Sequence, residues 1–436
     1  MIPSPRFIQI LAVGAPLWTV GALMPGGWLA GLAWLVLALI LFAQDAYRAP
    51  GKGRLSVRRN LPARFSLGEE QRVELCFSNQ SPLRLKLRIR DELPAALELS
   101  GTMPEVEIPP KGAAVCAYAV RAVRRGMHEY GQVIVRVEHG LGLALREYRL
   151  TVDDQIKVYP RFRGVDDYDL VAKIDRREEF VRRPRRVPGS GMEFESLRPY
   201  VAGEDPRQID WKATARRATL ISRNRQVEKG QQIAVLIDSG RLMAEAIDGL
   251  TKLDHALNAA ILLGHVAQKR GDTLAAACFS NRIESFLPAV RGAAIMPRVL
   301  EALYRVEPRL VESDYWLVTA QVMGMLHRRS LVILFTDLLD AASGVGLLNN
   351  LKRAARRHVV LCVVFRDPRL AALADSTPES AAQTFRVAAA CDLLRRRRLA
   401  LEQMRAGGIL VLETEPARLG VQVVRRYLEI RKADLQ

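Results

Sequence analysis

The chain has 436 residues, which is enough for two or three domains. Its formal net charge of +18 at pH 7 suits contact with anionic lipid, nucleic acid or an acidic partner, and carries no information about fold. The five cysteines are widely spaced, with no C-x-x-C pair and no histidine at a metal-ligand spacing, so a disulfide framework and a zinc motif are excluded. We expect reduced, mostly buried thiols, as in the cytosol.

The first 48 residues contain a long uncharged segment. No charged residue occurs between Arg6 and Asp45, and about 20 apolar residues are enough for one membrane-spanning helix. Residues 25–27 (Pro-Gly-Gly) interrupt the segment near its middle. We therefore predict a transmembrane helical hairpin, with helices at about 7–24 and 28–42.

Basic residues flank this predicted hairpin. Arg6 precedes it, and it is followed at once by Arg48, Lys52, Arg54, Arg58 and Arg59. The positive-inside rule then places both termini and the soluble domains in the cytoplasm, with two membrane spans joined by a short outer turn. The alternative is a cleaved signal peptide, which is disfavoured because the first residues carry one charge and no A-x-A site stands out.

In residues 49–160 the hydrophobic pattern changes to a period of two. Short alternating runs, such as 72–77 and 133–138, are separated by turn sequences. This pattern predicts a small antiparallel β-sandwich. Since no polar cluster converges in this segment, we expect a spacer that orients the next domain rather than a ligand site.

Residues 161–188 form a strongly basic connector. Its arginines include Arg176, Arg177, Arg182, Arg183, Arg185 and Arg186. In a membrane-anchored chain we expect a solvated tether or a contact with the anionic inner leaflet. A nucleic-acid contact is the weaker alternative, because aromatic residues for base stacking are almost absent from the run.

Residues 189–224 mix large aromatics with charges, too polar for a core and too aromatic for a linker. They read G-x-G-x-E-F, then L-R-x-Y-x-x-G-x-D-x-R-x-I-D-W-x-A-x-A-R. This pattern resembles the signature of a bacterial family, domain of unknown function fifty-eight. The segment is either a packing device, with Trp211 and Tyr200 buried and Asp210 paired with Arg216, or an exposed recognition loop. We expect mixed use, in which Trp211 and Phe194 are structural. The candidate partner contacts in the segment are Arg198, Asp205 and Arg207.

The rest of the 189–436 region alternates apolar strands with helical stretches. Strands are predicted at 233–237, 274–279, 331–335, 359–365 and 409–412, with a helix at 252–269. This order predicts a doubly wound α/β domain with a parallel sheet covered on both faces. Asp238 and Asp337 each follow a strand, so we expect both at the carboxyl edge of the sheet, where ligands bind in such folds.

This layout is similar to a von Willebrand factor A-like domain, which the family resemblance also implies. Such domains hold magnesium through D-x-S-x-S, a threonine from a second loop and a later Asp, all oxygen ligands. In this chain Asp238 and Asp337 match the two aspartates of that site. Both serine positions of the first motif are lost, to Gly240 and Leu242, and Ser239 lies one position away from the first of them. The expected second loop, 289–297, contains no threonine. We expect no cofactor, with weak magnesium binding at Asp238, Ser239 and Asp337 as an alternative.

Two other roles are open for the strand-end carboxylates. Arg241 could neutralise Asp238 or Asp337 through a charge-assisted bond, and Arg241 is also a candidate partner contact. Alternatively, the two carboxylates cap neighbouring backbone. The run 395–398 (four arginines) lies in a helical stretch, and we expect it to be a solvated face or part of a docking surface.

No catalytic motif is present in the sequence: H-E-x-x-H, G-x-S-x-G and a Walker A loop are all missing. We therefore predict a non-enzymatic, membrane-anchored scaffold or adaptor that binds a protein partner through the von Willebrand-like domain. The family resemblance implies a MoxR-type AAA+ ATPase as partner, in assembly or maturation of an envelope complex. The alternatives are a magnesium-dependent binding module using Asp238 and Asp337, and anionic lipid or nucleic-acid binding through the basic connector.

Overall fold

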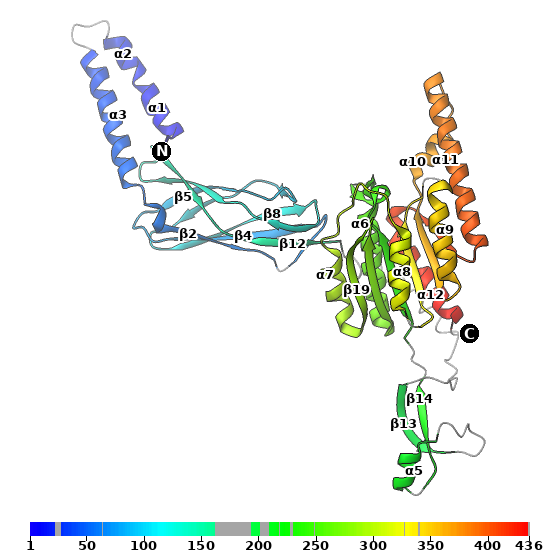
Figure 1. Ribbon diagram of the computed structural model, residues 1–436. Helices are drawn as coiled ribbons and strands as arrows, with labels where there is room; N and C mark the ends of the chain where they lie inside the picture. The colour runs from blue at the N-terminus through cyan, green and yellow to red at the C-terminus, as the bar shows by residue number, and fades with distance from the viewer. Residues whose placement is uncertain are drawn as a thin grey trace, which may run out of the picture. The chain divides into compact units, whose positions relative to one another are not determined.

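The computed structural model describes residues 1–21, 28–62, 64–161, 193–200, 209–217, 219–226, 230–247, 249–326, 328–338 and 341–434. The chain divides into two compact units, Met1–Arg161 and Phe162–Gln436, which are described separately (Figure 1).

In the first unit, helices are built mostly from the uncharged segment. Three helices are described there: α1 (Pro5–Val13), α2 (Ala15–Gly21) and α3 (Trp28–Arg48). Among the described residues, α3 alone is long and apolar enough to cross a membrane. The expected first helix is divided at Gly14, two residues before Pro16, which has no N–H to continue the helical hydrogen bonds. The Trp34 indole packs at Gly14, and Trp34 Nε1 donates to the Ile10 carbonyl at 3.2 Å. Two spans and their orientation stay predictions.

The antiparallel sandwich predicted for residues 49–160 is confirmed. One sheet has the order β1-β11-β10-β5-β7 and a second the order β2-β4-β8-β6, and their inward side chains share one core. Burial alternates along the strands, as a sheet with one solvated face requires. The strands of the two sheets are β1 (Ile2–Pro3), β2 (Leu55–Asn60), β4 (Glu70–Asn79), β5 (Leu85–Asp91), β6 (Leu97–Ser100), β7 (Glu105–Ile108), β8 (Ala113–Ala122), β10 (Val133–His139) and β11 (Ala144–Leu150). A small third sheet joins β3 (Phe65–Ser66), β12 (Gln155–Tyr159) and β9 (Gly126–Glu129).

The expectation that no polar cluster converges in the sandwich is wrong. The buried guanidinium of Arg59 donates to Asp91 at 2.6 and 3.0 Å and to Asp154 at 2.8 Å. Tyr118 Oη donates to the same Asp91 carboxylate at 2.5 Å. The partners are spread over three strands and a loop, so their convergence depends on strand pairing that local sequence does not reveal.

A carboxylate ties α3 to the sandwich. Asp45, in the last turn of α3, accepts backbone N–H bonds from Leu141 at 3.1 Å, Leu143 at 2.8 Å and Ala144 at 3.1 Å. The loop that supplies these donors turns through Gly140 and Gly142, which have φ of 55° and 68°. The helix end is therefore fixed to the β10–β11 turn by charge-assisted bonds.

In the second unit, the signature segment forms a small hairpin with a helix. β13 (Glu193–Pro199) pairs antiparallel with β14 (Ile221–Gln226), and α5 (Trp211–Arg217) lies between them in the chain. Asp210 begins α5 and accepts from the backbone N–H groups of Lys212 at 3.0 Å and Ala213 at 3.1 Å.

The larger part of this unit is built on a six-stranded sheet with the order β19-β18-β15-β20-β21-β22. The five predicted strands are confirmed and run parallel: β15 (Gln232–Asp238), β18 (Thr273–Phe279), β20 (Leu331–Thr336), β21 (Val359–Phe365) and β22 (Leu410–Thr414). A sixth strand, β19 (Ile283–Arg291), was not predicted and adds an antiparallel edge. Residues 289–297, expected to be a loop, instead hold the end of β19 and the start of the next helix.

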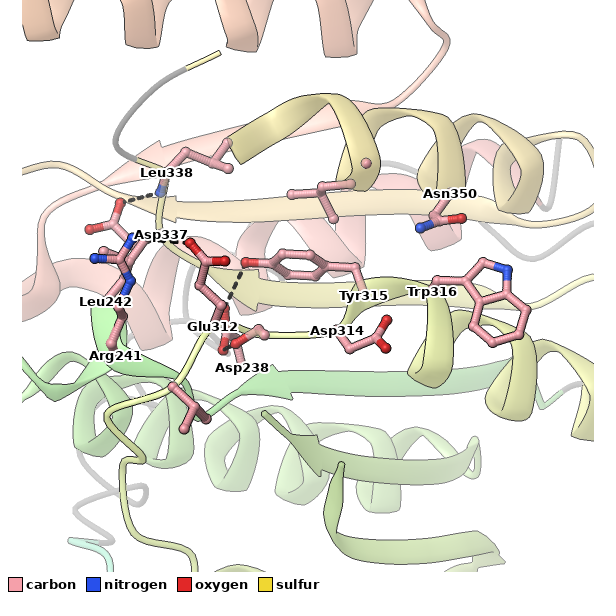
Figure 2. Close-up of a pocket in the computed structure, with 14 residues that line it drawn as sticks. Asp238, Arg241, Leu242, Glu312, Asp314, Tyr315, Trp316, Asp337, Leu338 and Asn350 are labelled. Atoms are coloured by element: carbon pink, nitrogen blue, oxygen red, sulfur yellow. Dashed lines mark hydrogen bonds and ion pairs between the residues drawn. The ribbon is translucent and has the colours of Figure 1, made fainter. Parts of the chain in front are cut away.

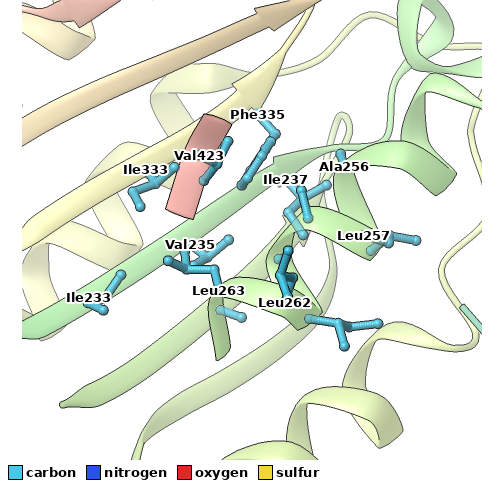
Figure 3. Packing of buried hydrophobic residues seen from close by; sticks show 14 of the residues in the cluster. Ile233, Val235, Ile237, Ala256, Leu257, Leu262, Leu263, Ile333, Phe335 and Val423 are labelled. Carbon is cyan, nitrogen blue, oxygen red and sulfur yellow. The ribbon is translucent and has the colours of Figure 1, made fainter. Parts of the chain in front are cut away.

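Helices cover both faces of this sheet. α6 (Lys252–Arg270), α7 (Ile295–Leu303) and α12 (Leu419–Asp434) share one core with Ile233, Val235 and Ile237 of β15 (Figure 3). α8 (Tyr315–Met325), α9 (Ala341–Ala355) and α11 (Ala381–Ala406) share a second core with the alternate β15 residues Ala234 and Leu236. The short helix α10 (Pro368–Ala374) precedes α11, whose first part extends past the sheet (Figure 1). The prediction of helices on both faces is confirmed, but the sheet is mixed rather than wholly parallel, because β19 is antiparallel.

Candidate functional site

A cavity of about 400 Å³ opens at the carboxyl edge of the sheet (Figure 2). It lies between β15 and β20, where the chain order changes direction: from β15 the chain proceeds to β18 and β19 on one side, and from β20 to β21 and β22 on the other. Such a switch point is the usual ligand position in a doubly wound sheet. As expected, Asp238 and Asp337 both line it.

The Asp238 carboxylate is saturated by donors from the protein itself. One oxygen accepts from Ser313 Oγ at 2.5 Å and from Gly240 N at 2.8 Å. The other accepts from Thr336 Oγ1 at 2.7 Å and from Tyr315 Oη at 2.9 Å. Burial, and then the neighbouring carboxylate, raise the pKa of Tyr315, so its hydroxyl stays protonated as a donor at neutral pH.

The Asp337 carboxylate lies between two buried cations. Lys252 Nζ is 2.5 Å from one oxygen, and Arg397 Nη1 is 3.0 Å from the other, which also accepts from Leu338 N at 2.8 Å. Burial alone lowers the pKa of Lys252, but Asp337 and Glu245 outweigh it and hold this pKa above its usual value. Lys252 therefore stays charged at neutral pH and compensates the acidic edge permanently.

The outer rim of the cavity carries charged and aromatic groups open to solvent. Arg241 forms an ion pair with Glu312 at 3.2 Å, with both side chains exposed. Asp314 caps α8 by accepting from Leu317 N at 3.0 Å. Trp316, in the first turn of α8, is 58% exposed and faces the cavity mouth beside Asn350 (Figure 2).

Two predictions about this edge are corrected. Arg241 does not neutralise Asp238 or Asp337, because its guanidinium forms an ion pair with Glu312. Asp337 forms its ion pairs with Lys252 and Arg397 instead. The four-arginine run is not wholly solvated, because Arg397 is 8% exposed and reaches Asp337.

Magnesium finds little of its usual ligand set at this edge. Ser239 Oγ donates to the Phe279 carbonyl at 2.9 Å and so is committed elsewhere. Ser313, Tyr315 and Thr336 do supply hydroxyls around Asp238, but each is spent as a donor to that carboxylate. Among the described residues, no group of three or more His, Cys, Asp or Glu side chains is placed to hold a metal ion. The capping alternative fits better, because Gly240 N and Leu338 N both donate to the carboxylates.

The remaining site candidates are only partly placed by the structure. Arg198 lies in β13, and nothing is described of its side chain. Asp205, Arg207 and the connector arginines 176–186 lie outside the described residues. Trp211, expected to be structural and buried, is instead 66% exposed in α5, and Asp210 caps that helix.

Sequence reasoning missed the groups that complete the edge: Lys252, Arg397, Ser313, Tyr315 and Thr336. Only Lys252 carried a usable signal. A lysine at the first position of a helix opposes the helix dipole, so its presence there suggests a buried acidic partner.

Comparisons with known proteins agree with the signature. Residues 196–397 match the family model described as "Protein of unknown function DUF58". Uncharacterized proteins of Mycobacterium tuberculosis and Mycobacterium bovis are 24% identical over 191 residues, or 43% of this chain and 59% of theirs. The chain thus spans just over half the length of these curated relatives.

Similar solved structures are distant. A conserved hypothetical protein, BatB, from Bacteroides thetaiotaomicron has a TM-score of 0.32 and 10% identity, over 47% of this chain and 100% of that one. A fragment of alpha-2-macroglobulin from Escherichia coli has a TM-score of 0.21 and 23% identity, over 25% of this chain and 17% of that one. The family model is therefore the finding that identifies the second unit: the chain carries a DUF58 family domain, matched over residues 196–397.

Proposed function

We propose that this protein is a membrane-anchored, non-enzymatic adaptor that binds a protein partner at the carboxyl edge of its six-stranded sheet. The observation that carries the proposal is the state of the two strand-end carboxylates. Asp238 and Asp337 accept seven hydrogen bonds or ion contacts from donors of the same domain, so neither is free to act as a base or nucleophile. An edge built in this way presents a fixed surface, with an exposed tryptophan on its rim, which suits recognition.

The domain type is part of the proposal. A parallel sheet with an antiparallel edge, helices on both faces and two acidic strand ends at the switch point supports a von Willebrand factor A-like domain. Domains of this layout bind ligands at the edge where the cavity lies.

The partner and the location are proposed from the resemblance and from composition. The family signature implies a MoxR-type AAA+ ATPase, acting with the adaptor in assembly or maturation of an envelope complex. The apolar helix α3 and the basic residues after it support anchoring in a bacterial inner membrane, with the soluble units in the cytoplasm.

The test is a tagged purification of the full chain from detergent-solubilised membranes, with and without non-hydrolysable ATP. An AAA+ ATPase should co-elute in a nucleotide-dependent way. The double charge reversal Arg241→Glu with Glu312→Arg keeps the rim ion pair but inverts it, so it should reduce this retention. Arg425→Glu, on the exposed face of α12, is the control and should leave retention unchanged. Hydrolysis of nucleotide or peptide by the purified protein alone would contradict the adaptor.

The magnesium alternative has its own test. Titration calorimetry with magnesium chloride should give no binding heat with the full chain, because a cation would have to displace Lys252 from Asp337. Saturable heat that is lost in Asp238→Ala would replace the metal-free adaptor by the magnesium-dependent module.

A further inference from the structure

A groove runs between α8 and α9, next to the edge cavity. The α8–α9 groove is the hollow of about 230 Å³ bounded by Trp316, Ala320 and Met323 of α8 and by Asn350, Arg353 and Arg357 at α9 and its end. The residues of each row are three or four positions apart, so each row follows one face of its helix. Trp316 and Asn350 also line the edge cavity, so the two hollows are adjacent.

Several groups in the α8–α9 groove have no partner among the described residues. The Trp316 indole is largely exposed, and neither its N–H nor the Asn350 amide makes a hydrogen bond within the described parts of the chain. Arg353 and Arg357 are exposed and form no ion pair with any described carboxylate. An exposed indole beside two arginines without ion-pair partners combines the residue types, Trp and Arg, that are enriched among the anchors of protein interfaces.

The two ends of the groove differ in charge. At the edge cavity, Glu312 and Asp314 are exposed, and Arg241 compensates only one of them. At the other end, Arg353 and Arg357 place two uncompensated positive charges. Between these ends lie Trp316, Ala320 and Met323, an apolar strip of about 10 Å at 1.5 Å per helical residue.

We propose that the α8–α9 groove binds an amphipathic helical segment of a protein partner, with basic residues at the Glu312 end and acidic residues at the Arg353 end. Its apolar side chains pack on Trp316 and Met323. Two helices with regular side-chain rows form a groove that accepts the ridge of a third helix, and opposite charges at the two ends fix its direction. The proposal deepens the proposed function, on which it rests, by naming the chemistry of the bound segment.

The test uses synthetic helical peptides and the full chain in detergent. Fluorescein-labelled 14-residue peptides carry the same stripe of leucines and differ only in their ends: lysines at one end and glutamates at the other (in both orders), lysines at both, or glutamates at both. Fluorescence anisotropy, with empty micelles as blank, should show one bipolar peptide binding at least about fivefold more tightly than either single-sign peptide. Trp316→Ala should weaken its binding about tenfold or more. Phe385→Ala, which removes an aromatic on α11 that is 78% exposed, is the matched control and should have no effect.

Charge reversal makes the test specific to this groove. Arg353→Glu with Arg357→Glu should move the preference to the all-lysine peptide, and Glu312→Lys should move it to the all-glutamate peptide. Equal binding of all peptides, or a preference that survives both reversals, would overturn the proposal. Peptide preference without a co-eluting ATPase would remove only the proposed partner, whereas a co-eluting ATPase without peptide preference would remove only the groove.

Discussion

Lys252 is one of the two buried cations that neutralise Asp337 at the acidic edge of the sheet. Lys252 is the first residue of α6, where the helix dipole and burial both disfavour a cation. Its contacts with Asp337 and Glu245 outweigh these costs. Removing one partner of a buried ion pair leaves the other uncompensated, and this costs more than the pair contributed.

Lys252→Met should therefore destabilise the α/β domain by about 3 kcal/mol, since Arg397 still neutralises part of Asp337. Denaturant-dependent hydrogen exchange of peptides from β15 and β20 would measure this loss. Lys269→Met, at an exposed position of the same helix, should cost less than about 0.5 kcal/mol. A Lys252→Met protein as stable as the Lys269→Met protein would show that the edge does not depend on this cation.

His358 makes the α/β domain sensitive to acid. Burial, and then Arg357, lower its pKa below the usual value, and its Nδ1 accepts from Ser330 N at 3.3 Å, which requires the neutral ring. Below about pH 6.5 the His358 ring binds a proton in the unfolded chain more readily than in the folded domain. The neutral ring therefore contributes to the stability of the folded domain above that pH, and this contribution is lost as the pH falls through the lowered pKa.

His358→Gln keeps an acceptor but cannot titrate, so the fall in the thermal midpoint between pH 7 and pH 5 should be smaller in this variant. His255→Gln is the control, because that histidine is half-buried and lies on α6, where its ring contacts the Ile247 carbonyl rather than Ser330. The same acid sensitivity in the wild type and in His358→Gln would show that another group dominates.

At the scale of elements, the junction between α3 and the β10–β11 turn depends on one carboxylate. Asp45 accepts from three backbone N–H groups of the turn. A Cβ at Gly140 would lie 2.5 Å from Asp45 Oδ1, so a larger residue at this position would clash with the carboxylate. Asp45→Ala should cost about 3 kcal/mol of local stability, because three N–H groups lose a charged acceptor.

Hydrogen exchange of residues 139–145 would measure this loss at the junction itself. Glu98→Ala, at an exposed position of β6, is the control and should leave exchange at 139–145 unchanged. Slow exchange of this turn in Asp45→Ala would mean that the sandwich alone orders it.

The parallel strands were predictable and the edge strand was not, for one physical reason. Strands such as β20 are buried on both faces and read as unbroken apolar runs. β19 buries only Leu287 and Val290, and it contains Pro288, which a central strand excludes but an edge strand tolerates. Its pattern therefore resembles a loop.

The candidate site was half predictable. Asp238 and Asp337 were found because each directly follows an apolar strand. Their partners were not, because Lys252 and Arg397 are 85 and 60 residues from Asp337, and Ser313 and Tyr315 are 75 and 77 residues from Asp238. Contacts at such separations exist only after the sheet has formed.

At the scale of the whole molecule, one cysteine can test the membrane orientation proposed for the DUF58 unit. Cys391 on α11 is exposed, Cys76 is half-buried, and Cys116, Cys278 and Cys362 are buried. Burial raises the pKa of Cys116 to about 11 and that of Cys362 to about 12, which further suppresses their thiolates.

A membrane-impermeant maleimide should label Cys391 in permeabilised cells but not in intact spheroplasts, if the soluble units are cytoplasmic. Cys391→Ser should remove most of the label in permeabilised cells, and denaturation should expose the buried thiols in both proteins. Labelling of Cys391 in intact spheroplasts would place the DUF58 unit outside and reverse the proposed orientation.

The part of α11 that extends past the sheet is not constrained by core packing, whereas the part that covers the sheet is. Its 26 residues span about 39 Å, whereas the seven residues of β21 span about 23 Å. The buried residues described for α11 all lie from Ala390 onward, and none is buried in α10. Substitutions across 368–389 therefore leave the sheet and both its cores untouched. Folding therefore places little constraint on the residues of this projection. Its surface can change during evolution while the sheet and its cores stay intact.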